Sequence, residues 1–161
     1  MDSLMLNVGL DYHCDSVRVC ILDAAGEVLV NRNCANDWRQ IDQLTRRHGT
    51  VAKASIEACC GAADLAEELM HNARWPITMS HPGLVRRMKQ SPDKHDRGDA
   101  YISADLVRLG YLPKVWLAPA AVRELRRLVR FRQQLADRRR DLKLRIGAIA
   151  RELRLVTNHT R

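Results

Sequence analysis

Three short apolar runs separated by turns fill the first 32 residues of the chain. The run over residues 4–10 is followed at once by an acidic residue, and the run over 17–22 is rich in β-branched side chains. Residues 23–26 have the composition of a tight turn, and residues 27–31 alternate between apolar and polar side chains. The pattern predicts an antiparallel meander of three strands.

Helical and extended segments alternate in the next part of the chain. A helix is predicted from Asp37, as N-cap, to a stop near Gly49, and it is followed by a buried strand over residues 51–57. A second helix then leads to a strand over residues 75–80. Three strands followed by helix, strand, helix, strand and helix predict an α/β or α+β fold with a mixed sheet.

A heptad pattern begins after Pro119. Apolar residues recur there at spacings of three and four, which predicts one helix on the order of 35 residues long. Such a helix is longer than a small domain is wide, so we expect it to pair as a coiled coil with a second copy of the chain. We therefore divide the chain into a domain over residues 1–113 and a long basic helix over 114–161. The predicted seam consists of Leu125, Leu128, Arg132, Leu135, Arg139, Leu142, Ile146, Ile149, Leu153 and Val156.

Positive charge is concentrated in the second half of the chain. The net charge is +8, and residues 81–161 hold 20 lysines and arginines against 8 aspartates and glutamates. This surplus favours a nucleic-acid partner. Arginines in the middle of the seam either select its register or reach toward a polyanion, and the basic residues before it either bind phosphates or only keep the surface soluble. The candidate nucleic-acid contacts are Arg86, Arg87, Lys89, Lys94, Arg97, Arg132 and Arg139.

Cysteine usage and hydropathy indicate the compartment. The five cysteines are odd in number and lack a CxxC spacing, which argues against disulfides and against a zinc site. There is no charged-then-apolar leader and no apolar run near the roughly 18 residues of a membrane helix. We expect a reduced, cytoplasmic protein without a membrane partner.

Four carboxylates are candidates for a metal site. If the first and fourth strands are adjacent and parallel, Asp11 and Glu57 project from the same edge of the sheet, where open α/β sheets place their sites. Asp96 and Asp99 share one face of the next predicted helix, although they could equally be capping residues. Oxygen-only ligation suits Mg²⁺ or Mn²⁺, and two such ions about 4 Å apart are suited to phosphodiester chemistry.

Six segments, taken in order, carry a family resemblance. Over about residues 5–155 the chain resembles the N-terminal domain of DEDD-type insertion-sequence transposases of insertion sequence family one-ten. The resemblance implies a ribonuclease-H-like (RuvC-like) fold, with Asp11, Glu57, Asp96 and Asp99 as catalytic residues that bind two Mg²⁺ or Mn²⁺ ions. The matching segments are residues 8–11, 17–26, 56–61, 81–85, 94–100 and 122–126.

The resemblance also implies a function. In that family the domain belongs to a recombinase that cleaves and joins DNA strands in transposition under the direction of a structured guide RNA. We accordingly expect DNA and guide RNA as partners, a homodimer or tetramer assembled through the long helix, and a place in the bacterial cytosol or nucleoid. Family members continue into a second domain with a nucleophilic serine, whereas this chain stops at Arg161, so we expect it to be incomplete for transposition.

Two other functions remain open on the sequence. One is a nucleic-acid-binding and dimerisation module without chemistry of its own. The other is an actin-like phosphotransferase, which also opens with a strand, an acid and a hairpin. Tyr12 and His13 follow the acid here in place of phosphate-cradling glycines, which argues against the second alternative.

Overall fold

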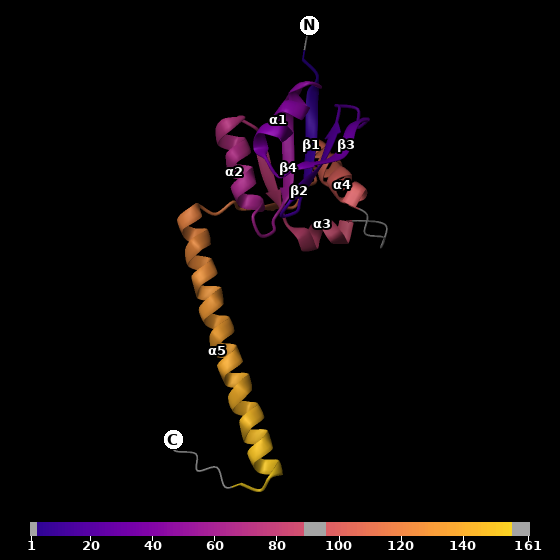
Figure 1. Ribbon diagram of the computed structural model, residues 1–161. Coiled ribbons are helices and arrows are strands. Elements are labelled where there is room, and N and C mark those ends of the chain that lie inside the picture. The colour runs from indigo at the N-terminus through magenta and orange to yellow at the C-terminus, as the bar shows by residue number, and fades with distance from the viewer. Residues whose placement is uncertain (1–2, 89–95, 156–161) are drawn as a thin grey trace. The chain divides into compact units, whose positions relative to one another are not determined.

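The computed structural model describes residues 3–88 and 96–155, with the backbone alone at Arg86, Asp96 and Arg97. The chain forms two compact units, residues 1–117 and residues 118–161. The first unit contains a sheet with helices on both faces, and the second contains one long helix (Figure 1).

A six-stranded mixed sheet organises the first unit. The strand order is β3-β2-β1-β4-β5-β6, in which β1 pairs antiparallel with β2 and parallel with β4. The pairs β2–β3 and β5–β6 are antiparallel, and β4–β5 is parallel. The meander and the mixed sheet predicted from the sequence are confirmed. The strands are β1 (Met5–Tyr12), β2 (Ser16–Leu22), β3 (Val28–Ala35), β4 (Thr50–Glu57), β5 (Ile77–Ser80) and β6 (Lys114–Val115).

The clearest differences from the sequence-based expectation are at β3 and β6. β3 runs to Ala35, past the expected end at residue 31, because its residues pair with β2 as far as Ser16. Residues 114–115, which the sequence assigned to the long-helix segment, form β6 and pair with Met79 and Ser80 of β5.

The helices pack on both faces of the sheet. Asp37 caps the first helix, as predicted, by accepting a hydrogen bond of 3.0 Å from Arg39 N. Within residues 3–88, α3 follows β5 directly, and Figure 1 shows it at the end of the sheet where β1 and β4 finish. The helices are α1 (Trp38–Arg46), α2 (Ala62–Asn72), α3 (Pro82–Met88), α4 (Asp96–Leu109) and α5 (Ala120–Glu152).

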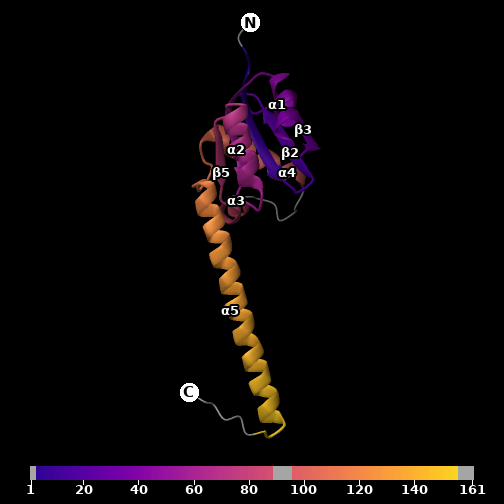
Figure 2. The ribbon, with the colours of Figure 1, turned by 60° about the vertical axis from the view of Figure 1, so that its left-hand side comes forward.

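Alternation along the strands builds two separate apolar layers. Leu6, Val8 and Leu10 of β1 are fully buried on the face covered by α1 and α2. On the other face α4 packs through small residues, and Ala100 and Ala104 are fully buried against Cys20 and Leu22 of β2 (Figures 1 and 2). A mixed sheet in this strand order, with helices on both faces, is a ribonuclease-H-like fold.

Helix α5 begins after Pro119, as predicted, and ends at Glu152. Its apolar side chains are largely exposed within the chain, for example Leu128 at 60% and Ile146 at 65%. Leu153 is the C-cap of the helix and not a helical seam position, and Val156 lies outside the described residues.

Candidate active site

Asp11 and Glu57 lie side by side at the carboxyl ends of two parallel strands. The preceding residues, Leu10 and Ile56, are partners in the β1–β4 pairing. Because Leu10 and Ile56 point into the core under α1 and α2, alternation turns the two acids to the face covered by α4. Strand neighbours are about 4.8 Å apart, so the two carboxylates share one small region.

The thiol of Cys59 lies in the same region. Burial is the main cause that raises the pKa of Cys59, while a hydrogen bond from the backbone of Ala62 lowers it. The negative charges of Glu57 and Asp11 raise the pKa further. One sulfur atom therefore lies within electrostatic range of both carboxylates.

His13 contacts the first of these acids. Its Nε2 lies 3.5 Å from Oδ2 of Asp11, and the side chain of His13 is 50% exposed while that of Asp11 is 20% exposed. The carboxylate of Asp11 is thus mostly covered at the end of its strand. His13 lies at the exposed border of the site, where its imidazole can orient the Asp11 carboxylate or shield it from solvent.

The backbone of α4 packs directly on the backbone of β1 at Gly9, which leaves no room for a side chain there. A Cβ atom built on Gly9 would lie 2.5 Å from Ala104 N and closer still to Ala100 O. Ser55, which pairs with Gly9 from β4, donates a hydrogen bond of 2.9 Å to Ser103 O. The turn of α4 between Ala100 and Ala104 therefore rests on the middle of β1 and β4.

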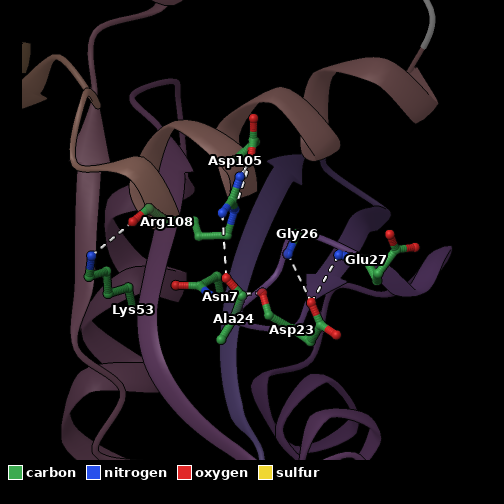
Figure 3. A network of polar contacts seen from close by, with 8 residues as sticks. All are labelled: Asn7, Asp23, Ala24, Gly26, Glu27, Lys53, Asp105 and Arg108. Atoms are coloured by element: carbon green, nitrogen blue, oxygen red, sulfur yellow. Dashed lines mark hydrogen bonds and ion pairs between the residues drawn. The ribbon is translucent and has the colours of Figure 1, made fainter.

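A polar network fixes the other end of α4 (Figure 3). Arg108 binds Asp105 at 2.6 Å and also donates to Ala24 O in the β2–β3 turn at 3.4 Å. Lys53 of β4 donates to Arg108 O at 3.0 Å, which satisfies a carbonyl at the end of the helix. Asp23 closes the turn itself by accepting from Gly26 N at 2.8 Å.

The close packing on Gly9 and the polar contacts of Arg108 together set the direction of α4. Its C-terminal turn lies over the beginning of β1 and β4, and its middle lies over Gly9, so its N-terminal turn extends toward Asp11 and Glu57. The backbone of Asp96 is one helical turn before Ala100, a step of about 6 Å. Gly9 to Asp11 is a similar step along β1, about 6.6 Å.

The four predicted acids are described unequally by the structure. Asp11 and Glu57 come together, and Asp99 is half-buried on α4, one position before Ala100. The side chain of Asp96 lies outside the described residues. Among the side chains that are described, no three His, Cys, Asp or Glu residues are grouped closely enough to hold a metal ion.

The predicted phosphate contacts lie on three segments. Arg87 is exposed on α3, which begins where β5 ends. The side chains of Arg86 and Arg97 are outside the described residues. Lys89 and Lys94 lie outside the described residues altogether. Arg132 and Arg139 are exposed on α5.

Two residues near the acids were missed from the sequence. The close packing at Gly9 could have been predicted, because an isolated glycine within a strand pattern often marks a close approach of another backbone. Arg18 had no such signal in the sequence, since its importance depends on the strand pairing that places it opposite Asp11.

Comparison with protein families identifies the chain. Residues 8–154 match the family of IS110-type DEDD transposases, whose description is transposase. The chain belongs to this family. The match spans both units and includes all four predicted acids, and it makes the first unit part of a DNA transposase. No curated protein matches this transposase chain significantly. None of its helices, in the part that the structure describes, is both long and apolar enough to cross a membrane.

Proposed function

We propose that the ribonuclease-H-like unit is the metal-dependent catalytic domain of this transposase, which cleaves and transfers DNA strands. The observation that carries the proposal is the pairing of β1 with β4, which puts Asp11 and Glu57 next to each other on the face crossed by α4. Family membership supplies the reaction class.

Asp11, Glu57, Asp96 and Asp99 would hold the metal, as Mg²⁺ or Mn²⁺, with two ions expected. Their carboxylate oxygens are the ligands that these hard cations prefer. When bound, the metal would activate the attacking oxygen and stabilise the leaving oxygen of a phosphodiester. The direction of α4 supports this set, because its N-terminal turn extends toward the two strand ends.

The chain's own groups shape the site around these acids. The 3.5 Å contact from His13 Nε2 orients the carboxylate of Asp11. The close packing of α4 on Gly9 fixes the distance between the helix and the sheet, which keeps the carboxylates of α4 at a fixed distance from β1. Basic residues of α3 would bind phosphates near the cleaved bond, and those of α5 would separately bind nucleic-acid backbone.

Assembly through α5 is the second part of the proposal. A helix of 33 residues with exposed leucines and isoleucines at heptad spacing suits a coiled-coil dimer or tetramer of this chain. A structured guide RNA would be the further partner, attracted by the positive surplus of residues 81–161, in the bacterial cytosol or nucleoid.

Metal titration by calorimetry tests the catalytic proposal. We expect the parent chain to bind Mn²⁺ and Asp11→Asn and Asp99→Asn each to weaken binding at least about tenfold, since even outer-shell changes have effects of that size. Asp15→Asn is the matched control, because Asp15 is an exposed acid in the turn after β1. Cleavage of a duplex oligonucleotide should require the metal and be lost in Asp11→Asn.

The binding-module alternative predicts different results. In that case nucleic-acid binding would depend on salt but not on chelator, and Asp11→Asn would behave like Asp15→Asn in every assay. Equal Mn²⁺ affinity in the parent and in a folded Asp11→Asn variant would therefore refute the catalytic proposal.

A further inference from the structure

A row of polar residues crosses the sheet on the face toward α4. Strand pairing places Ser80 beside Glu57, Asp11 beside Arg18, and Arg18 beside Asn33. Since Glu57 and Asp11 are also neighbours, the row runs without a gap from β5 to β3. Along it, two carboxylates are followed by a guanidinium and then by an amide.

Arg18 is held toward β3 by three hydrogen bonds. Its Nε donates to Asn31 Oδ1 at 2.8 Å, its Nη1 to Asn33 Oδ1 at 3.2 Å, and its Nη2 to Asn31 O at 2.9 Å. All three acceptors are neutral amide oxygens. Over the described residues, no ion pair joins Arg18 to a carboxylate, including that of its strand neighbour Asp11.

The hydrogen bonds of Arg18 do more than link β2 to β3. A guanidinium has more N–H donors than these three bonds use, and its positive charge is not neutralised by the amides that hold it. Because Asn31 and Asn33 fix the planar group, little side-chain entropy would be lost when it binds a ligand. The geometry is that of a preorganised anion contact.

We infer that Arg18, oriented by Asn31 and Asn33, binds the phosphodiester backbone of a nucleic-acid strand next to the Asp11–Glu57 site. This inference rests on the proposed function, because it assigns the strand's path beyond those acids. Phosphate oxygens accept from a guanidinium in pairs, and such charge-assisted bonds are the strong ones. A phosphate near the carboxylates would have its neighbour in the same strand over β2 and β3.

Arg32 offers a matched control on the same hairpin. It is exposed on β3 between Asn31 and Asn33, and alternation points it to the opposite face of the sheet. Arg18→Gln and Arg32→Gln therefore remove the same charge from positions within one hairpin. Only the first should affect a strand that crosses the face with Asp11.

The test is fluorescence anisotropy with a labelled single-stranded oligonucleotide of about 20 nucleotides, measured for DNA and for RNA over a range of salt. We expect Arg18→Gln to weaken binding about fivefold or more and to reduce the salt slope by about 0.7, which corresponds to one phosphate contact on a single strand. Arg32→Gln should leave the slope unchanged. Whichever of DNA and RNA shows the larger change in Arg18→Gln is the strand that follows this path.

Arg18→Lys separates binding from structure. It keeps the charge, so the salt slope should stay near that of the parent, but it loses the planar fork, so affinity should fall by a few-fold. Equal effects of Arg18→Gln and Arg32→Gln, or full affinity in Arg18→Lys together with unchanged binding in Arg18→Gln, would overturn the Arg18 site and leave the proposed function standing. No binding of either nucleic acid by the parent would count against both.

Discussion

Trp75 donates a hydrogen bond from its indole Nε1 to Oδ1 of Asp42, at 3.0 Å, across 33 residues of sequence. The other carboxylate oxygen, Oδ2, accepts from Arg46 Nε at 2.6 Å. Asp42 is 8% exposed and Trp75 is 5% exposed, so this buried link joins α1 to a residue two positions before β5. The link lies near the amino end of β5, whereas the candidate active site lies at the carboxyl ends of β1 and β4.

Removing Asp42 should therefore destabilise the first unit. Asp42→Ala leaves a buried indole N–H without an acceptor, and we expect the free energy of unfolding to fall by about 2–3 kcal/mol. Arg46→Ala should lower it by less than about 1 kcal/mol, because the Arg46 side chain is 68% exposed. Urea unfolding followed by tryptophan fluorescence measures both, and equal losses in the two variants would contradict this account.

Gly9→Ala should displace α4. The added methyl group would meet backbone atoms of Ala100 and Ala104, which cannot rotate away, so the helix itself must move. We expect a loss of unfolding free energy of about 1–3 kcal/mol or more, together with weaker Mn²⁺ binding. Gly98→Ala is the control, since no heavy atom of the described residues, apart from its own helix backbone and chain neighbours, lies within 4 Å of its added Cβ, and it should stabilise α4 by up to about 1 kcal/mol. A folded Gly9→Ala variant with the parent's metal affinity would show that α4 does not position the site.

The order of strands and helices could be predicted because it is a local property. Short β-branched runs, the turn at residues 23–26 and the cap at Asp37 each act over a few residues, and all of them have the predicted structure. The parallel pairing of β1 with β4 was only a condition of the predicted site, because the sequence leaves the strand order open, and the structure shows that the condition is met.

Other parts of the site depend on contacts that no local pattern encodes. Nothing around Arg18 indicates that it faces Asn31 and Asn33, because that depends on the register between β2 and β3. The same holds for Arg108, whose contact with Ala24 spans 84 residues. Leu153 is not a helical seam position for a local reason, since the helix ends at Glu152 and Arg154 has a positive φ of 54°.

Cys20 should make stability depend on pH in the alkaline range. Burial raises the pKa of its thiol from 9.0 to about 11, although the charge of Arg18 opposes the shift. The unfolded thiol ionises more readily, so this contribution is complete below about pH 9 and is lost as the pH rises toward about 11. We expect Cys20→Ala to show a smaller decline in unfolding free energy over that range, by on the order of 2 kcal/mol. Cys14→Ala, at an exposed cysteine, should keep the parent's decline.

A single substitution in α5 should test its association. Leu135 is a predicted seam position and is 49% exposed within one chain, while the adjacent Gln134 lies off the seam. Leu135→Glu and Gln134→Glu add the same charge at neighbouring positions, but only the first puts a carboxylate into the proposed apolar interface. We expect Leu135→Glu to weaken self-association at least about tenfold in sedimentation equilibrium, because burying one leucine contributes about 1.5–3 kcal/mol. Gln134→Glu should leave the association constant within about a factor of two of the parent's, because an exposed charge contributes little. If both variants associate equally well, the contact between copies does not use this seam.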